Sequence, residues 1–350
     1  MSRTATRPLR LALAGFGNVG RTFAELLPGP YGRALRAEGA APVVTAIFTN
    51  RHGAAIDPRG LSLSRALRLV RAGRSLEPLH RGPPVRSALD LVRRAPADVL
   101  VELTPLAPAT GEPAISLARA ALGRGLHVVT ANKGPVAHAR ARLVRLAARS
   151  GVRFLHEGAV LDGTPVFNLV ERCLPGARIL GFRGLLNSTT TRVLAGMEAG
   201  ASFEAALAEA QRAGVAEADP RHDVEGWDAA VKACALANAL MGADVRPAAV
   251  ERRGISGLGP GDVRAARGRG AVLRLIARAR RDGRAVRVSV GPEEVADGDV
   301  LVSRGADGVL VLETDLMREI GIWEGAGGVD QTAYAILSDL VAIARGRRRR

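Results

Sequence analysis

The 350-residue sequence is poor in lysine, cysteine and aromatic side chains, and it contains no long apolar run. The absence of any apolar stretch near 18 residues excludes a membrane-spanning helix, and the polar residues 1–10 do not resemble a secretory signal. Cys173 and Cys234 lack the close spacing of a metal site or a redox pair, so a disulfide scaffold is excluded and reduced thiols are expected. We therefore expect a cytoplasmic protein that does not associate with membranes.

The charge is strongly basic, with a formal net value of +16 at pH 7. Such a charge often indicates binding to nucleic acid or to an anionic membrane. Here the arginines are spread along the whole chain, and the one basic run, residues 347–350, belongs to a tail at 346–350 that we expect to be disordered. Aromatic residues make up only 3% of the chain, so side chains for stacking on bases are scarce. The composition favours no specific nucleic-acid partner.

Lysine is almost completely replaced by arginine, because Lys133 and Lys232 are the only lysines among 50 basic residues. Arginine substitutes well for lysine where a cation serves solubility, ion pairing or phosphate binding. A lysine ammonium differs because burial lowers its pKa enough for proton transfer, whereas a guanidinium stays protonated. Unless the two lysines survive by chance, they mark positions at which a titratable or compact cation is needed.

The N-terminal segment has the pattern of a dinucleotide-binding turn. Residues 9–14 form a short apolar run that predicts a buried strand, and residues 21–27 predict a helix. The G-x-G-x-x-G motif between them allows a tight turn, a close approach of the pyrophosphate and close packing of the helix on the strand. A plain turn is the alternative. The predicted cofactor-binding residues of this motif are Gly15, Phe16, Gly17, Asn18, Val19 and Gly20.

The second predicted strand, residues 43–49, ends without the acidic residue that binds the ribose hydroxyls of NAD. It runs instead into Asn50, Arg51 and His52, and an arginine at this place suits the 2′-phosphate of NADP. An exposed loop arginine without a ligand is the alternative in so arginine-rich a chain. We expect NADP to be favoured over NAD as the cofactor, with Arg51 as a cofactor-binding residue.

Two further apolar runs predict buried strands, at residues 97–103 and 127–130, with a helix at 113–124 between them. This alternation is typical of a right-handed parallel α/β sheet, in which ligands bind at the carboxyl ends of the strands. Thr104 and Lys133 each follow such a strand end. We therefore predict an α/β fold with an N-terminal Rossmann-type parallel sheet, in which Thr104 and Lys133 lie at the cofactor crevice.

The regular alternation ends near residue 155, which predicts a second domain of a different, α+β type. We expect a dinucleotide-binding domain at residues 1–155 and a second domain, for substrate binding and dimerisation, at 156–324. A glycine-rich stretch precedes the C-terminal helix, and we expect residues 325–345 to pack back on the first domain. The elements predicted for the second domain are helices at 165–173, 203–213 and 227–241 and a strand at 178–186.

The helix predicted at 227–241 carries Asp228 and Lys232 four residues apart, so the two side chains share one face. The carboxylate would hold the ammonium in place, while burial lowers the pKa of the lysine. A concentrated acidic loop, residues 217–226, precedes this helix in an otherwise basic chain. The alternative is an ordinary salt bridge worth about 0.2–0.5 kcal/mol, but arginine would serve equally well in that role. The pair therefore indicates a catalytic site.

Six stretches of the sequence together resemble the homoserine dehydrogenase family, and they span most of the chain. The most specific are TANK within residues 127–135 and the pattern DP-x2-D-x2-G-x-D-x3-K within 216–233. The others are GFGNVG at 15–20, VELTP at 101–105, RGISGL at 253–258 and GAGGVDQTAYAILSDL at 325–340. The resemblance implies NAD(P)H-dependent reduction of L-aspartate 4-semialdehyde to L-homoserine, a reversible step towards threonine, methionine and isoleucine.

The resemblance also implies roles for individual residues. Lys232 matches the proton donor and acceptor at the substrate oxygen, and Asp228 belongs to the same catalytic group. Lys133, at the junction of cofactor and substrate, is the other candidate for proton transfer. Reduction of an aldehyde leaves alkoxide character on its oxygen, which an ammonium both stabilises and protonates. The substrate-binding positions are Glu217, Asp223, Asp228 and Thr189, and further cofactor-binding positions are Gly214 and Gly328.

Two further partners are implied by the resemblance: a second copy of the chain in a homodimer, and a monovalent cation, Na⁺ or K⁺. Residues 187–192 depart from the family pattern, with Ser188, Thr191 and Arg192 as replacements. This departure leaves open a sister dehydrogenase that acts on another small amino-acid aldehyde. The net charge of +16 leaves open a second alternative, a catalytically silent protein that binds nucleotide or nucleic acid. The cation-binding positions would be Glu157, Val160, Asp162 and Thr164.

Overall fold

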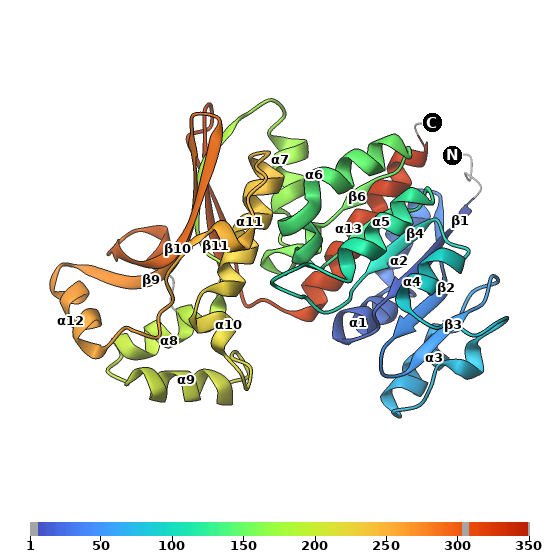
Figure 1. The fold of residues 1–350 in the computed structure, drawn as a ribbon, viewed down its shortest axis with the longest axis horizontal. Coiled ribbons are helices and arrows are strands. Elements are labelled where there is room, and N and C mark those ends of the chain that lie inside the picture. The colour runs from blue at the N-terminus through green and yellow to red at the C-terminus, as the bar shows by residue number, and fades with distance from the viewer. Residues whose placement is uncertain (1–5, 303–307, 349–350) are drawn as a thin grey trace. The chain divides into compact units, whose positions relative to one another are not determined.

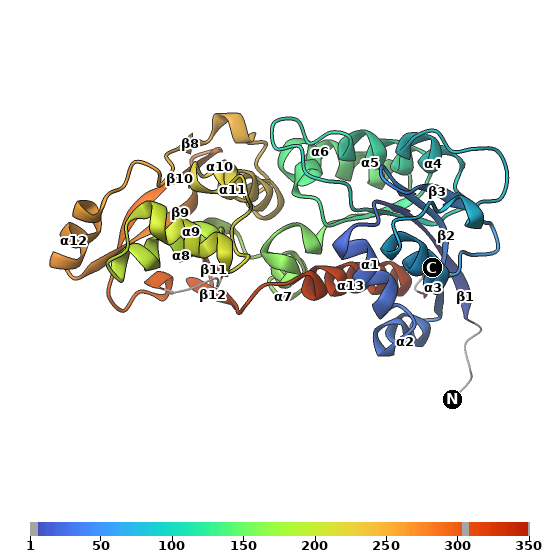
Figure 2. The same ribbon diagram turned by 90° about the horizontal axis from the view of Figure 1, so that it is seen from below.

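The computed structural model describes residues 6–302 and 308–348, and the chain divides into two compact units. Unit 1 comprises the chain up to Pro165 together with the stretch from Gly328 onwards, and unit 2 comprises Val166–Gly327. Each unit is built around one sheet with helices packed against it (Figures 1 and 2). The first boundary lies after Pro165 rather than after residue 155, because residues 157–163 pack against the last helix of unit 1.

Unit 1 contains a six-stranded sheet in the order β3-β2-β1-β4-β5-β6. All neighbouring strands run parallel except β3, which pairs antiparallel with β2 at the edge. The second half of β1 and all of β4 are buried, as is typical of central strands in a parallel sheet. The predicted Rossmann-type sheet is confirmed. Its strands are β1 (Arg7–Ala14), β2 (Ala40–Thr49), β3 (Gly53–Ile56), β4 (Val99–Glu102), β5 (His127–Thr130) and β6 (Phe154–Leu155).

Helices alternate with these strands, as the sequence predicts for the first domain. Several of them are amphipathic: in α3 the residues Ala66, Leu67, Leu69 and Val70 are buried, while its arginines are exposed. The helices up to Arg149 are α1 (Asn18–Leu26), α2 (Pro30–Ala37), α3 (Leu63–Arg71), α4 (Ala88–Arg94), α5 (Ala114–Gly123) and α6 (Lys133–Arg149). Three short 3₁₀ turns complete the unit: η1 (Glu77–Leu79), η2 (Glu157–Ala159) and η3 (Leu161–Gly163).

The C-terminal helix α13 (Val329–Arg348) belongs to unit 1 and packs against α1 and α2 (Figure 2). Its residues Ile336 and Leu340 are fully buried in the same apolar core as Leu11 of β1. The helix continues to Arg348, and therefore through part of the segment that the sequence predicts to be a disordered tail. Residues 349–350 lie outside the described residues.

Unit 2 contains a second six-stranded sheet, in the order β12-β11-β7-β9-β10-β8. The neighbours are antiparallel except β8, which runs parallel to β10. This mixed topology confirms the predicted second domain of α+β type. The strands are β7 (Ile179–Leu185), β8 (Glu251–Arg252), β9 (Ala271–Asp282), β10 (Ala285–Ala296), β11 (Gly308–Thr314) and β12 (Glu319–Glu324).

The helices of unit 2 include the alanine-rich α11, which packs against β9 and β10. Alanine is the best helix former, and the small side chains allow α11 to lie close to the sheet. Its buried Cys234 is a free thiol whose pKa is raised to about 12 by burial, and the exposed Cys173 is also free. The helices are α7 (Val166–Cys173), α8 (Ser188–Glu198), α9 (Phe203–Arg212), α10 (Arg221–Val224), α11 (Trp227–Leu240) and α12 (Pro260–Gly268), with 3₁₀ turns η4 (Pro247–Ala249) and η5 (Val300–Val302).

A bilayer-crossing helix is not found anywhere in the part of the chain that the structure describes, because each helix is too short or too polar.

Candidate active site

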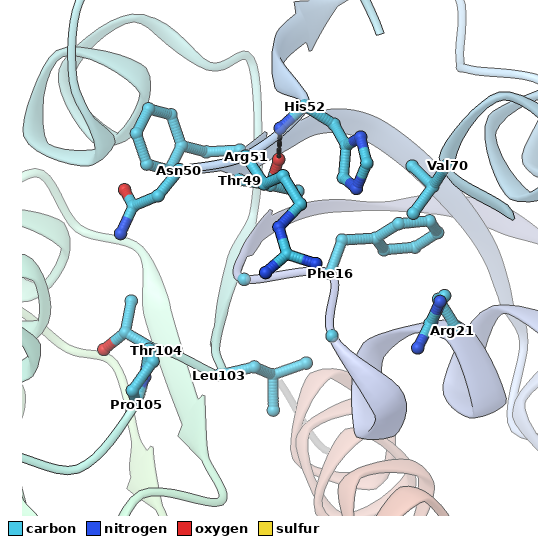
Figure 3. Close-up of a pocket in the computed structure, with 13 residues that line it drawn as sticks. Phe16, Arg21, Thr49, Asn50, Arg51, His52, Val70, Leu103, Thr104 and Pro105 are labelled. Atoms are coloured by element: carbon cyan, nitrogen blue, oxygen red, sulfur yellow. Dashed lines mark hydrogen bonds between the residues drawn. The ribbon is translucent and has the colours of Figure 1, made fainter. Parts of the chain in front are cut away.

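A pocket of about 360 Å³ lies in unit 1 at the carboxyl ends of β1, β2 and β4. This edge of the sheet is where the sequence predicts the cofactor (Figure 3). Three of the predicted cofactor-binding residues of the glycine motif line it, together with Arg51 and Thr104. The lining residues are Gly15, Phe16, Gly17, Arg21, Phe48, Thr49, Asn50, Arg51, His52, Val70, Leu103, Thr104 and Pro105.

The glycines of the motif are required by close packing and by backbone conformation. Gly15 has φ +108°, and a Cβ atom there would lie 2.4 Å from the carbonyl oxygen of Leu103. A Cβ atom at Gly20 would lie 3.0 Å from the carbonyl oxygen of Gly15. Gly17, by contrast, has open space around its Cβ position, and as the N-cap residue of α1 it has no side chain to cap the helix. The turn therefore leaves room beside the start of α1, where a pyrophosphate suits the helix N–H groups. These residues fit a dinucleotide.

The other two residues of the motif, Asn18 and Val19, form the first turn of α1 rather than the turn itself. Asn18 accepts a hydrogen bond of 2.6 Å from the guanidinium of Arg21, which lines the pocket. The Asn18 carboxamide thus orients the Arg21 guanidinium beside the pocket. A role of Asn18 and Val19 in cofactor binding stays a prediction.

The loop after β2 supplies the basic side of the pocket. Figure 3 shows the Arg51 side chain extending into the middle of the pocket, beneath the loop of Asn50 and His52. The loop is held in shape by a hydrogen bond of 2.7 Å from the His52 N–H to the hydroxyl of Thr49. The imidazole Nδ1 of His52 lies 3.1 Å from the carbonyl oxygen of Arg74. None of the residues that line the pocket is acidic, so an anionic group meets only neutral and positive side chains there.

A buried carboxyl group, Glu102, ties the end of β4 to the end of β5. It accepts hydrogen bonds from the Thr104 N–H at 2.7 Å, from the Thr104 hydroxyl, and from the Thr130 hydroxyl at 2.7 Å. Burial raises the pKa of Glu102, although these hydrogen bonds act in the opposite direction. Sequence reasoning gave this residue no site role, although it lies in the VELTP stretch at 101–105, because the stretch does not show which side chains its carboxyl group contacts. Its effect is to fix Thr104, which lines the pocket.

Asn132 continues this network from Thr104 to Lys133. Its amide donates to the carbonyl oxygen of Thr104 at 3.0 Å, and its carbonyl oxygen accepts the Gly134 N–H at 2.9 Å. Asn132 is therefore the N-cap of α6, and Lys133 is the first residue of that helix. The TANK segment thus places Lys133 at the same edge of the sheet as Thr104, as the sequence predicts.

In unit 2, Lys232 is held by two oxygen atoms. Its Nζ donates to the carbonyl oxygen of Leu186 at 2.7 Å and lies 2.9 Å from Oδ2 of Asp228. The Lys232 and Asp228 side chains are only 21% and 17% exposed, so the pair is more enclosed than an ordinary surface salt bridge. The ammonium therefore has a defined position on α11, next to the end of β7.

Asn187, between β7 and α8, joins this pair to the acidic loop. Its Nδ2 donates to Asp228 at 3.1 Å and to Asp223 at 2.8 Å. The hydroxyl of Thr189 donates to the other oxygen of Asp223 at 2.9 Å. The structure thus brings together four of the predicted residues, Thr189, Asp223, Asp228 and Lys232. Asn187 was not among the predicted site residues, although a helix-capping asparagine after a strand was a signal that could have found it.

Two other predicted residues of unit 2 lie on exposed turns. Glu217 is exposed on the loop between α9 and α10, and its carbonyl oxygen accepts a hydrogen bond of 3.1 Å from Gln211. Gly214 has φ +70° at the turn that ends α9, where a residue with a side chain would be strained. The roles of Glu217 in substrate binding and of Gly214 in cofactor binding stay predictions.

The predicted cation-binding residues lie in the turns η2 and η3 and just after them, beside α13. Glu157 is buried, and its N–H donates to a carboxylate oxygen of Asp339 at 3.0 Å. Asp162 is exposed, with φ +43°. The described residues contain no cluster of three or more His, Cys, Asp or Glu side chains that would hold a metal ion. A cation in this segment would therefore depend on main-chain oxygens, such as those of Val160 and Thr164.

Gly328 is the first residue of the stretch that returns to unit 1, directly before α13. Its carbonyl oxygen accepts a hydrogen bond of 3.3 Å from the Thr332 N–H, so it forms part of the helix start. The pocket in unit 1 and the hydrogen-bonded carboxylate cluster in unit 2 each gather some of the predicted residues, whereas Gly214, Glu217 and the predicted cation-binding residues lie on other turns. Lys133 lies in unit 1, at the edge of the sheet that carries the pocket, and Lys232 lies in the carboxylate cluster of unit 2.

Comparisons with known proteins agree on one family. The family model for homoserine dehydrogenase matches residues 165–341, and the model for the NAD-binding domain of homoserine dehydrogenase matches residues 15–157. An NAD(+)-dependent homoserine dehydrogenase of Pseudomonas canavaninivorans is 36% identical, covering 95% of this chain and 96% of its own. A homoserine dehydrogenase of Methanocaldococcus jannaschii is also 36% identical, covering 95% and 98%. A solved hyperthermophilic archaeal homoserine dehydrogenase in complex with NADPH has a TM-score of 0.79 and 26% identity, covering 96% and 98%.

Proposed function

Because the chain belongs to the homoserine dehydrogenase family, we propose that it reduces L-aspartate 4-semialdehyde to L-homoserine, with Lys232 as the proton donor. It is an NAD(P)-dependent oxidoreductase that acts on a CH–OH group. The single observation that carries the residue assignment is the position of the Lys232 ammonium, 2.9 Å from Asp228 on a partly enclosed helix face. The reaction belongs to the route towards threonine, methionine and isoleucine.

Proton transfer is the chemistry that this chain must supply. The bound nicotinamide provides the hydride for the aldehyde carbon. The Lys232 ammonium stabilises the negative charge that grows on the substrate oxygen and donates a proton to it. Asp228 keeps the ammonium in place and favours its charged form before transfer. In the direction of homoserine oxidation, the neutral amine of Lys232 accepts the hydroxyl proton.

The charge around Lys232 favours an amino-acid substrate. Asp223 and Asp228 lie in one hydrogen-bonded cluster with a single lysine, and Glu217 belongs to the same acidic loop region. The carboxylates therefore outnumber the ammonium, and a substrate α-ammonium would restore the balance. Thr191 lies in the segment that departs from the family pattern, but its hydroxyl bonds to the carbonyl oxygen of Asn187 within the start of α8. This bond gives Thr191 a role within the helix, and the assays with other amino alcohols described below test the sister-dehydrogenase alternative.

We propose NADP as the preferred cofactor. The support is the loop after β2, where Arg51 reaches into a pocket whose lining carries no carboxylate to bind ribose hydroxyls. Replacing Arg51 with alanine should lower kcat/KM for NADP⁺ by about 10- to 100-fold, from the loss of charge-assisted hydrogen bonds, and should change kcat/KM for NAD⁺ little. Steady-state rates with both cofactors measure this ratio. Equal losses with NAD⁺ and NADP⁺ would contradict a contact to the 2′-phosphate.

We also propose a homodimer, a monovalent cation in the segment from Glu157 to Thr164, and activity in the cytoplasm. Exposed apolar side chains at the β11–β12 hairpin, Leu316, Met317 and Trp323, support self-association through unit 2. Light scattering coupled to size-exclusion chromatography tests the dimer.

Exchange of K⁺ and Na⁺ for choline during the assay tests the cation. The two free cysteines agree with a reducing compartment.

The decisive experiment for the proposed function is an absorbance assay at 340 nm with L-homoserine, run in parallel with NAD⁺ and NADP⁺. Formation of reduced cofactor with either one is expected, faster with NADP⁺. Absence of any homoserine-dependent reduction with both cofactors would overturn the proposal. Parallel assays with other small amino alcohols separate a homoserine dehydrogenase from a sister enzyme.

A further inference from the structure

The side chain of Asn187 makes three hydrogen bonds at one place in unit 2. It is 7% exposed, and its carbonyl oxygen accepts the Thr190 N–H at 2.9 Å, which caps the start of α8. Both of its N–H groups face carboxylates, those of Asp223 at 2.8 Å and Asp228 at 3.1 Å. The cap and the two carboxylates therefore use both N–H donors of the amide and one of the two acceptor positions on its carbonyl oxygen.

The cap also settles which way the amide points. A flipped amide would set its NH₂ against the Thr190 N–H and its carbonyl oxygen against Asp223 and Asp228, so every contact would become repulsive. The main chain of Asn187 is fixed as well, because its own carbonyl oxygen accepts the hydroxyls of Thr190 at 3.0 Å and Thr191 at 3.1 Å. Because the start of α8 holds both the amide and the main chain of Asn187, the two side-chain N–H groups point at the carboxylates in a fixed orientation.

Because the Asn187 amide is neutral, it bridges the two carboxylates without changing the net charge of the cluster. A lysine or arginine in place of Asn187 would neutralise the cluster and would compete with Lys232 for Asp228. An apolar side chain would leave two carboxylates to repel each other without a shared donor. The carboxamide holds Asp223 and Asp228 in place and leaves their negative charge available for the Lys232 ammonium and for a cationic group of the substrate.

We propose that Asn187 is the positioning residue of the proton-transfer site. It fixes the Asp228 carboxylate, and Asp228 in turn keeps the Lys232 ammonium 2.7 Å from the carbonyl oxygen of Leu186. It fixes Asp223 at the same time, together with the hydroxyl of Thr189. Asn187 acts on the reaction through these neighbours. The inference rests on the proposed function, in which Lys232 transfers the proton.

Replacing Asn187 with serine tests this role without removing the helix cap. A serine hydroxyl is as good an N-cap acceptor as asparagine, but it is too short to reach both carboxylates. N187S should lower kcat for homoserine oxidation on the order of 10- to 100-fold, from the loss of charge-assisted hydrogen bonds. The KM for the cofactor should stay close to the wild-type value, and the Tm should fall because two charge-assisted hydrogen bonds are lost. N187A, which also lacks the cap, should show the same kcat with a still lower Tm.

The matched control is N238S, the same substitution on the helix that carries Lys232. The Asn238 amide bonds to the main chain of Val245 at 2.9 Å in both directions, so its role is structural. N238S should lower the Tm and leave kcat within about twofold of wild type, because its bonds are to a loop backbone. Wild-type kcat in N187S would show that Asn187 only caps α8, and would overturn the proposal.

A spectroscopic measurement keeps the test independent of activity. Because the chain has two lysines, protein labelled with ¹³C-lysine gives only two lysine Cε signals, which the variant K133R assigns. N187S should move the Lys232 signal and leave the Lys133 signal in place, whereas an unmoved Lys232 signal would overturn the inference. If wild-type protein fails to oxidise homoserine, the proposed function is wrong, and this measurement still decides whether Asn187 positions Lys232.

Discussion

Replacing Lys232 with arginine separates the charge of this side chain from its ability to transfer a proton. The two oxygens that hold the ammonium lie 2.7 Å and 2.9 Å away, and a guanidinium offers donors for both. Asp228 would keep a cationic partner, so no carboxylate is left uncompensated. Since the pair is 21% and 17% exposed, the free energy of unfolding should change by less than about 1 kcal/mol.

The expected loss of activity is much larger than the change in stability. A guanidinium does not release its proton in the accessible pH range, so K232R loses general acid–base catalysis, which contributes about 10²- to 10⁴-fold. That range corresponds to about 3–5 kcal/mol in the barrier. Steady-state rates at 340 nm with homoserine measure kcat, and thermal unfolding monitored by fluorescence measures the Tm of the same samples.

K133R is the matched comparison, because it makes the same change at the other lysine. If Lys232 transfers the proton, K133R should raise the KM for cofactor or substrate and keep a larger share of kcat than K232R. Retention of more than a tenth of the wild-type kcat in K232R, at an unchanged Tm, would refute the assignment. A large kcat loss confined to K133R would move the proton transfer to Lys133.

Three further predictions concern the scaffold of the site and the core. Gly15→Ala should prevent cofactor binding, measured by NADPH fluorescence titration, because its Cβ would lie 2.4 Å from the Leu103 carbonyl oxygen at φ +108°. Arg274→Ala should lower the free energy of unfolding in urea by about 2–3 kcal/mol, because the side chain is fully buried and its loss leaves Glu198 with only the more exposed Arg267, 3.5 Å away. Burial raises the pKa of Glu102, so the folded chain binds its proton more tightly than the unfolded chain and stability falls as the pH rises above 4.5. Glu102→Gln should remove this dependence in Tm measurements from pH 5 to 8; an unchanged slope would contradict the role of burial.

The strand and helix pattern of unit 1 was largely predictable because each element carries its own signal. The apolar runs at β1 and β5 are short and bounded by glycine or polar residues, which is typical of buried parallel strands. The pocket followed from the glycine turn, since its position in front of α1 is a local consequence of the motif. Sequence and structure agree here because local preference and tertiary packing favour the same conformation.

Unit 2 was harder to predict from sequence. The start of α8 carries three consecutive threonines, whose β-branched side chains disfavour helix. The helix forms because Asn187 caps it and the hydroxyls of Thr190 and Thr191 bond back to the main chain. The long β9–β10 hairpin was also not predicted, although Asp282 followed by glycine at its turn was an available signal.

The two residues that organise the site, Glu102 and Asn187, were not among the predicted site residues for a common reason. Each acts in part through contacts with residues far away in the sequence: Glu102 bonds to Thr130 as well as to the nearby Thr104, and Asn187 bonds to Asp223 and Asp228. Both residues stand in stretches that the sequence analysis singled out, 101–105 and 187–192. A stretch of neighbouring residues does not show which distant side chains each of its members contacts, so the positioning roles become visible only in the folded chain.

The two lysines lie in opposite electrostatic surroundings, and this contrast favours different tasks for them. Lys133 is the first residue of α6, where its charge adds to the positive end of the helix dipole, an arrangement that costs about 0.3–1 kcal/mol. The positive electrostatic potential at such a position suits an anionic group of the cofactor or the substrate. Lys232 is paired with Asp228, whose charge is shared with Asn187, so its ammonium is stabilised without being fully neutralised. An ammonium held in this way, close to a group that favours its protonation again after each turnover, is suited to give and accept a proton repeatedly. In a chain that uses arginine for almost every other cation, only the second of these tasks strictly requires a lysine.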